Sequence, residues 1–444
     1  MLRRILPLTL IVSLLFVNTG AFAQVESTKK ISADDYPSEV ASAWFELLYD
    51  VVKAERTTPP AASRVYGITA VALYESIVTG TEANRSLVGQ LNSLMFVPQP
   101  TKVNKHHWPT VANAVLANTI RGLYSTISQA TLEAINNLEQ SFASRYRSEV
   151  GKPKYKRSLS HGQAVAAAIL QWAATDGFSV YNNCHYSARP VPGAWEPTPP
   201  LLSPSPLQPC WGFIRPMVLT SGAECPAHGH PAFSTNTASE FYAAALEVYT
   251  VGLGLTTEQK TIADYWSDGA SATGTPPGHW IAIVSQIARN DGLSLARAAE
   301  AYAHVGIAVH DAFIACWNEK YVTNLQRPVT YINRNFDGNW RPYIVTPNFP
   351  TYTSGHSSQS GAAASVLTDM FGVKGFKDTT HTDHGLVPAQ QPRTFSSFVQ
   401  AAAEAAISRL YGGIHYAFDN DDGLTCGECI GKAIHDRVSF KNNN

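Results

Sequence analysis

The sequence from Ser294 to Glu319 reads SLARAAEAYAHVGIAVHDAFIACWNE, and it decides the fold class of this chain. It is rich in alanine, contains no proline, and repeats its apolar residues at helical spacing. Similar patterns recur along the chain, whereas strand-like alternation is sparse and short. The sequence therefore predicts an all-α fold. Further helices are expected at residues 41–54, 61–78, 109–126, 130–147, 160–175, 236–251, 256–268, 279–290, 354–370 and 396–411, and from about Cys429 onward.

A segment rich in proline, residues 178–235, separates the helical patterns into two groups. A long loop of this kind in a compact protein is often functional or cross-linked. At 444 residues the chain is longer than one ordinary domain. We therefore expect an N-terminal helical bundle at residues 24–235, which includes this loop, and a C-terminal helical bundle at residues 236–444. The segments 66–72 and 305–311 read alike, one in each half, which favours two related bundles.

Positively charged side chains gather in two short motifs of the C-terminal half. Lys320 and Arg327 are seven residues apart, so on a helix that Pro328 ends they would project from one face. Arg409 ends another predicted helix, and His415 follows the Gly-Gly pair that interrupts it. Lys and Arg side chains that converge neutralise the oxygens of a bound oxyanion. Taken alone, the Lys320 pattern also fits surface charges at a helix end.

Between these two motifs, Ser354-Gly355-His356 marks the start of another helix. Ser354 is a typical N-cap residue, Gly355 allows close approach of a ligand to the backbone, and the helix dipole attracts an anion. One histidine, His356, could move protons while His415 bonds the central atom of the anion. Asp419 could hold the other ring nitrogen of His415. Helix capping by Ser354 and helix support by the His415–Asp419 pair are the ordinary alternatives.

Together, the patterns Lys-x6-Arg-Pro, Ser-Gly-His and Ser-Arg-x5-His-x3-Asp resemble a known signature. It is shared by the vanadium-dependent haloperoxidases and the type 2 phosphatidic acid or class A acid phosphatases. Thr353 departs from the pattern, because the phosphatases and most of the peroxidases have proline before Ser-Gly-His. The resemblance implies two packed four-helix bundles, with the anion site in the second.

The resemblance also implies a role for each motif residue. His415 would be the covalent ligand of vanadium, His356 the acid–base group, and Lys320 the group that also polarises bound peroxide. The vanadate oxygens would be bound by Lys320, Arg327, Ser354, Gly355 and Arg409. Asp419 would orient His415.

Three residues outside the motifs match positions that tune the site in this family. Asp268 lies in a segment whose family aspartate pairs with an active-site arginine. Trp317 corresponds to a tryptophan of the pocket. Phe349 falls where chloroperoxidases carry phenylalanine and bromoperoxidases carry histidine, which hints at chloride chemistry, although an aromatic residue in a proline-rich loop is also ordinary packing.

Two enzyme activities fit this resemblance. The first is a vanadate-dependent haloperoxidase, which oxidises halide with hydrogen peroxide to hypohalous acid or its equivalent. The alternative is an exported acid phosphatase, in which His415 forms a phosphohistidine and His356 protonates the leaving alcohol. Phosphate and vanadate are nearly isosteric, so the anion ligands do not separate the two. The chain length, the doubled bundle, Trp317 and Asp268 favour the peroxidase, and the preferred halide and any organic substrate are left open.

The N-terminus is typical of a secretory signal peptide at residues 1–23. Arg3 and Arg4 precede an apolar run, residues 5–17, and a small-x-small site ends at Ala23. The run is too short to anchor the chain in a bilayer, and the formal charge of −1 argues against nucleic acid or an anionic membrane as partner. We therefore expect an exported protein, periplasmic or secreted, whose partners are hydrogen peroxide and halide; a homo-oligomer is left open.

Six cysteines in an exported chain can form disulfides. Within the proline-rich segment, Cys210–Cys225 is the preferred bridge. Cys316 lies in an apolar helical pattern and is expected to be a buried thiol. Cys426 and Cys429 form a local bridge or two thiols at a helix start, in preference to a redox motif.

Four histidines outside the motifs invite interpretation as metal ligands. None of them has the paired spacing with nearby carboxylates that a metal site requires. We expect them in the core or in loops; they are His279, His310, His381 and His384.

Overall fold

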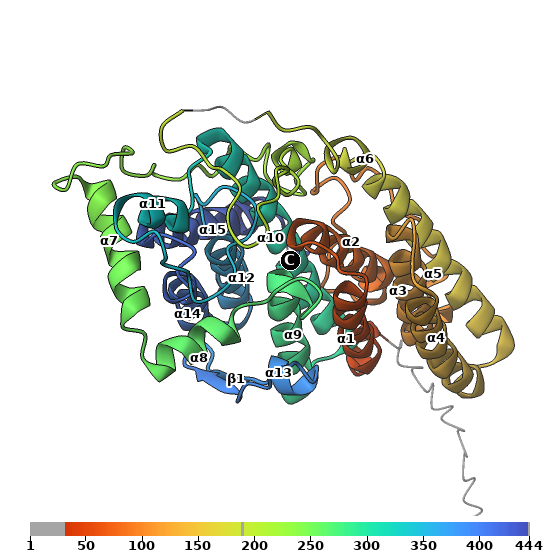
Figure 1. Cartoon of the computed structure of the whole chain (residues 1–444). Helices are drawn as coiled ribbons and strands as arrows, with labels where there is room; N and C mark the ends of the chain where they lie inside the picture. Colours follow the sequence, from red (N-terminus) through yellow and green to blue (C-terminus); the bar gives the residue numbers. More distant parts are fainter. Residues whose placement is uncertain (1–31, 188–190, 443–444) are drawn as a thin grey trace, which may run out of the picture. The chain divides into compact units, whose positions relative to one another are not determined.

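The computed structural model describes residues 32–187 and 191–442, where nearly all regular structure is helical (Figure 1). The all-α prediction is confirmed. The predicted signal peptide, residues 1–23, lies outside the described residues. The first helices are α1 (Glu39–Ala54), α2 (Pro59–Ile77), α3 (Trp108–Leu123), α4 (Gln129–Glu149), α5 (Lys152–Ala173) and α6 (Phe178–Tyr181). They are followed by α7 (Glu240–Leu253), α8 (Thr257–Tyr265), α9 (Thr275–Asn290), α10 (Leu295–Thr323), α11 (Pro328–Asn335), α12 (Gly355–Phe371), α13 (Thr380–Asp383), α14 (Phe398–Tyr411) and α15 (Ala417–Arg437).

The Ala-rich helix α10 lies between two groups of packed helices (Figure 1). On one side it contacts α2, which packs with α3 and α5; on the other it contacts α12, which packs with α14 and α15. Small residues let these helices approach closely: a Cβ atom on Gly67 of α2 would lie 2.8 Å from the carbonyl oxygen of Gly306 of α10. The predicted division into domains at residues 235 and 236 stays a prediction.

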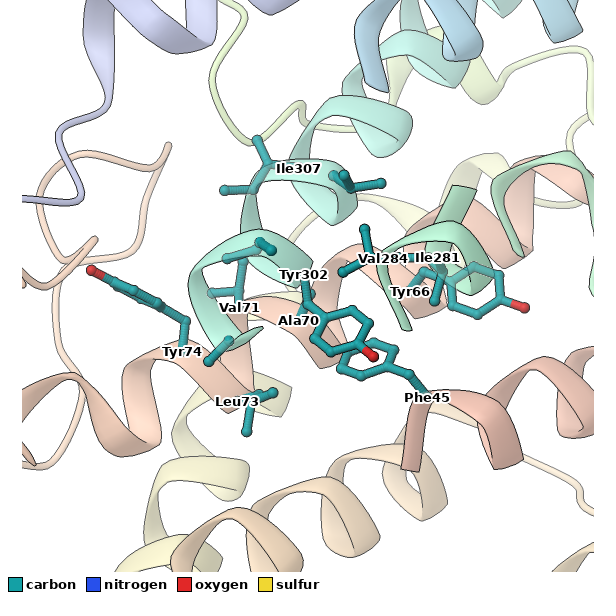
Figure 2. Close-up of a cluster of buried hydrophobic side chains, with 14 of the residues drawn as sticks. Phe45, Tyr66, Ala70, Val71, Leu73, Tyr74, Ile281, Val284, Tyr302 and Ile307 are labelled. Carbon is teal, nitrogen blue, oxygen red and sulfur yellow. The ribbon is translucent and has the colours of Figure 1, made fainter. Parts of the chain in front are cut away.

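Aromatic and branched side chains from four helices fill the core beside α10 (Figure 2). Tyr66 of α2, Ile281 of α9 and Tyr302 of α10 are wholly shielded from solvent. The rings of Phe45 in α1 and Tyr302 stack with their centroids 3.9 Å apart. Burial of each such side chain stabilises the fold by about 1.5–3 kcal/mol, so this cluster fixes α10, whose C-terminal end reaches the site described below.

The end of α10 differs from the predicted arrangement. The helix stops at Thr323, and Asn324 takes the left-handed conformation with φ 51°. Pro328 begins α11 instead of ending a helix, because proline is compatible with the first helical turn, and Arg327 is the N-cap residue. The prediction that Lys320 and Arg327 project from one helix is therefore wrong.

Other helix starts were also misplaced: α5 begins at Lys152 and not at residue 160, and α7 begins at Glu240 and not at residue 236. α15 begins at Ala417 and not near Cys429, although its first turns contain Asp, Asn and Gly. Packing of this stretch against α12 outweighs its weak helix propensity. α9 begins at Thr275, where two prolines occupy the first turn.

Strands are few in the described part of the chain. β1 (Phe376–Asp378) pairs antiparallel with β2 (Arg393–Phe395), with Phe376 opposite Phe395. Within residues 32–187 and 191–442, no helix combines the length and hydropathy that a membrane span requires.

The cysteines pair differently from the prediction. The disulfides are Cys184–Cys210 and Cys225–Cys429, so the expected Cys210–Cys225 bridge is wrong. A local bridge between Cys426 and Cys429 is also excluded, because Cys426 is a buried free thiol. Cys316 is the buried thiol that its helical pattern predicted.

Candidate active site

A cavity of 510 Å³ lies where the starts of α12 and α15 meet the end of α14. Among the predicted site residues, it is lined by Gly355, His356, Arg409, His415, Trp317, Phe349 and Asp268. The other four are fully buried beside this lining; they are Lys320, Arg327, Ser354 and Asp419. The motifs, far apart in the sequence, therefore come together at one place.

The N-terminus of α12 borders the cavity and is fixed by hydrogen bonds of Ser354. The Ser354 hydroxyl accepts a hydrogen bond from the Ser357 amide at 3.4 Å, and the Ser354 amide donates to the Asp419 carbonyl at 2.9 Å. These bonds cap α12 and tie its start to the start of α15. A Cβ atom on Gly355 would lie 3.5 Å from the Trp317 ring, so it would occupy space that the glycine leaves free next to a lining residue.

His415 is held in one tautomer. Its Nδ1 lies 2.8 Å from a carboxylate oxygen of Asp419, and its Nε2 lies 3.1 Å from Nη1 of Arg327. A guanidinium only donates, so Nε2 accepts and Nδ1 carries the proton that is donated to Asp419. Burial, together with the charges of Arg327 and Lys320, holds the pKa of His415 well below its usual range. His415 is therefore a neutral imidazole with its lone pair on Nε2.

Three site residues carry buried side-chain nitrogens without hydrogen-bond partners. In the described part of the chain, Nη2 of Arg327, Nε of Arg409 and Nε2 of His356 are buried and have no hydrogen-bond partner. Buried polar groups are almost always paired, so such a set indicates a ligand with several acceptor atoms. The residues present therefore fit a tetrahedral or trigonal-bipyramidal oxyanion.

The electrostatics of the site also indicate an anion. Burial lowers the pKa of Arg327 to about 9, and the charge of Arg409 adds to this effect. Burial likewise lowers the pKa of Arg409 to about 10 and that of Lys320 to about 8. Three cations buried this close together are costly unless negative charge accompanies them. An anionic ligand would remove that cost.

Lys320 does not face the cavity directly in this structure. Its ammonium donates to the carbonyl oxygens of Pro350 at 3.1 Å and Thr351 at 2.9 Å, and also to that of Thr353. Lys320 thereby fixes the loop backbone that precedes Ser354. Direct binding of the anion by Lys320 stays a prediction.

The sequence did not predict a buried group in which His279 lies between the carboxylates of Asp268 and Asp378. Nδ1 of His279 is 3.0 Å from Asp268, and its Nε2 is 2.7 Å from Asp378 of β1. Burial alone would lower the pKa of His279, but the two carboxylates outweigh burial and raise it to about 10. His279 is therefore an imidazolium. The Trp266 ring stacks on it with centroids 4.4 Å apart, and the Trp266 carbonyl accepts from Nη1 of Arg409 at 2.5 Å.

Asp268 therefore has His279 as its hydrogen-bond partner. Both of its carboxylate oxygens are directed to His279, while its charge still favours the cationic form of Arg409. The histidine was expected in the core or a loop, and it is wholly buried. Asp378 could not have been found, because it is 99 residues from His279 and in a segment without a motif. The described residues contain no group of His, Cys, Asp or Glu that could hold a metal ion.

Comparisons with known proteins show which proteins this chain is similar to. Residues 300–444 match the family described as the VCPO second helical-bundle domain. The chain is 26% identical over 215 residues to the vanadium chloroperoxidase of Curvularia inaequalis, covering 35% of each protein. It is 35% identical over 94 residues to the vanadium-dependent bromoperoxidase of Ascophyllum nodosum, covering 19% of this chain and 17% of that protein. The matched regions thus span about a third or less of these curated relatives.

Solved structures cover much more of the chain. A bacterial vanadium-dependent iodoperoxidase superposes with a TM-score of 0.84 and 34% identity, covering 92% of this chain and 98% of the other. A holo-type bacterial vanadium-dependent chloroperoxidase superposes with a TM-score of 0.64 at 15% identity, covering 86% and 92%. At that lower identity the likeness shows the fold alone.

Proposed function

Because this chain belongs to the vanadium-dependent haloperoxidases, whose cofactor is vanadate, we propose that it oxidises a halide with hydrogen peroxide. The observation that carries the proposal is the pair of buried, unpaired guanidinium nitrogens of Arg327 and Arg409 in the site that also holds His415 and the unpaired Nε2 of His356. Iodide is the halide proposed first, since a solved structure that matches 92% of this chain at 34% identity is that of an iodoperoxidase. Bound vanadate supplies a Lewis acid that activates peroxide without changing its own oxidation state.

The side chains of the site divide this work between binding and proton transfer. His415 Nε2 would be the ligand to the metal, and Asp419 keeps that nitrogen unprotonated by accepting from Nδ1. Nη2 of Arg327 and Nε of Arg409 would donate to anion oxygens. Both guanidiniums are already oriented by backbone carbonyls. The hydrogen bond from Nη1 of Arg327 to His415 Nε2 would be given up when the metal takes that lone pair.

His356 is suited to receive a proton. Burial and the charge of Arg409 hold its pKa well below the usual range, so it is neutral near pH 7. Its unpaired Nε2 lines the cavity and can accept a proton from entering hydrogen peroxide. The proton can then be returned as water is formed.

The experiment that tests the proposal separates it from phosphatase activity, which uses the same kind of anion site. Purified protein is assayed for triiodide formation from iodide and hydrogen peroxide, before and after addition of orthovanadate, and for hydrolysis of p-nitrophenyl phosphate. We expect vanadate-dependent triiodide formation that is lost in His415→Ala and retained in His435→Ala, an exposed histidine of α15. Rapid phosphate release without vanadate, and no iodide oxidation with it, would replace the peroxidase by the phosphatase.

We also propose that the protein is exported and loses residues 1–23. The signal-like N-terminus supports this, and so do the two disulfides, because such bonds persist in oxidising compartments. N-terminal sequencing of the exported protein is expected to begin at Gln24.

A further inference from the structure

The cavity is much larger than the proposed halide chemistry needs. Its 510 Å³ corresponds to roughly 17 water molecules at about 30 Å³ each, whereas vanadate, peroxide and halide are a few atoms apiece. The volume falls in the range of roughly 300–1,000 Å³ that is typical of sites for small organic molecules. Space therefore remains above the anion-binding residues.

The wall of that extra space is mostly apolar; its polar side chains are those of Thr58, Ser267, Thr346 and Asn348. Phe313, Trp317 and Phe349 supply aromatic surface near the catalytic histidines, and the rings of Trp317 and Phe349 are 5.0 Å apart. Farther out, the lining continues with a group that we name the rim: Pro59, Leu201, Leu207, Ile344, Val345 and Pro347. The rim carries no charged side chain. Such a wall favours a neutral, apolar ligand with an aromatic ring.

Two rim residues expose apolar surface that the fold does not require. Leu201 is 65% exposed and Val345 is 63% exposed, yet both border the cavity. Their loops are fixed relative to each other, because the Leu207 amide donates to the Asn348 carbonyl at 3.0 Å and Nδ2 of Asn348 donates to the Ser205 carbonyl at 3.2 Å. Nε1 of Trp317 also donates to the Leu207 carbonyl at 3.2 Å. The rim is thus a preformed surface.

We propose that this outer part of the cavity binds the organic molecule that receives the halogen, a neutral apolar phenol or enol of about two rings. The proposal rests on the haloperoxidase function. In the balanced reaction, Ar–H, X⁻, H2O2 and H⁺ give Ar–X and two H2O. Halide loses two electrons and peroxide gains them; a C–X bond forms, and the ring proton leaves to water. A molecule held between the rim and His356 would be halogenated before the oxidised halogen escapes.

The test uses 2-naphthol as the probe and separates binding from catalysis. Binding of 2-naphthol to the vanadate-free protein is measured by equilibrium dialysis. The variant Leu201→Asp/Val345→Asp is expected to weaken binding about tenfold, because it brings charge to an apolar contact. Val373→Asp, which alters a residue that is 84% exposed and absent from the cavity lining, serves as the matched control and is expected to bind like the parent.

The second measurement uses the vanadate-loaded protein with iodide, hydrogen peroxide and 2-naphthol. The ratio of iodonaphthol to triiodide is expected to fall in the rim variant and to stay unchanged in Val373→Asp. Equal binding of 2-naphthol by the parent and the rim variant, or no binding by either, would overturn the inference. Absence of triiodide from the parent would instead remove the haloperoxidase function, and the dialysis result would still decide whether the rim binds the phenol.

Discussion

At the scale of single residues, His415 depends on Asp419 for its protonation state. Asp419 accepts from Nδ1 of His415, from the Thr351 hydroxyl and from the Tyr416 amide, so it is fixed from three directions. A partner of this kind orients a metal-ligating histidine and raises its basicity. Without it, the imidazole would not be held in the orientation that directs its Nε2 lone pair toward Arg327.

We therefore predict that Asp419→Ala lowers vanadate affinity about 10- to 100-fold. Equilibrium dialysis of vanadate against the purified variant measures this without any assay of turnover. Asp436→Ala, which removes an exposed carboxylate of the same helix, is the control and should bind vanadate like the parent. Unchanged affinity in Asp419→Ala would mean that Asp419 does not position the ligand.

The contribution of His279 to the stability of the fold depends on pH. Its folded-state pKa of about 10 lies above the usual value of 6.5, so this contribution is complete below about pH 6.5 and is lost as the pH rises through about 10. Lys320 acts in the opposite sense: burial lowers its pKa from 10.5 to about 8, so its deprotonation above pH 8 relieves a cost. A variant of His279 separates its pH dependence from that of Lys320.

The comparison is between the parent and His279→Gln in chemical denaturation from pH 6 to 10. We predict that the difference in the free energy of unfolding is largest at pH 6, on the order of 3–5 kcal/mol, because the variant leaves two buried carboxylates uncompensated. The difference should shrink as the pH approaches 10. A difference that does not vary with pH would show that His279 is not charged in the folded protein.

At the scale of elements, α12 and α15 determine the geometry of the site because both begin beside it. Their contact is made by glycine: a Cβ atom on Gly361 would lie 2.7 Å from the Leu424 carbonyl oxygen, and one on Gly427 would lie 2.6 Å from the Ala362 amide nitrogen. Neither position tolerates a methyl group without a shift of backbone. Any such shift moves His356 relative to His415.

We predict that Gly427→Ala lowers the free energy of unfolding by about 1–3 kcal/mol, the cost of overpacking. It should also weaken vanadate binding, since the helix starts would separate. Gly254→Ala at the end of α7 is the matched control, because a Cβ atom there would meet only the Thr250 carbonyl oxygen at 3.8 Å. Thermal unfolding and vanadate dialysis on both variants check the prediction; equal behaviour would exclude a tight helix contact.

Local patterns predicted most helices but not every helix end. The periodicity of α10 is strong, whereas the first turns of α15 contain residues that disfavour a helix and are stabilised only by α12. The motifs indicated Arg409 and His415 because their spacing is local. Asp378 and Leu201 reach the site through tertiary contacts alone, so no spacing rule identified them.

At the scale of the whole molecule, disulfides connect the proline-rich segment to the rest of the fold. Cys225–Cys429 joins that segment to α15 across 204 residues, whereas Cys184–Cys210 closes only 26. The chain-entropy relation assigns roughly 5 kcal/mol to the long closure and roughly 3.5 kcal/mol to the short one. The long bridge therefore couples the segment that carries Leu201 to the helix that follows His415.

We predict that Cys225→Ser/Cys429→Ser loses more stability than Cys184→Ser/Cys210→Ser, by about 1–2 kcal/mol in the free energy of unfolding. Each double variant removes one bridge, so each serves as the control for the loss of a disulfide in general.

The two disulfides should also distinguish exported from cytosolic protein. Protein exported through residues 1–23 should retain two free thiols, Cys316 and Cys426. Protein made in a reducing cytosol should titrate six thiols after denaturation. If the cytosolic protein already contained both bridges and matched the exported protein in unfolding, the disulfides would give no support to export.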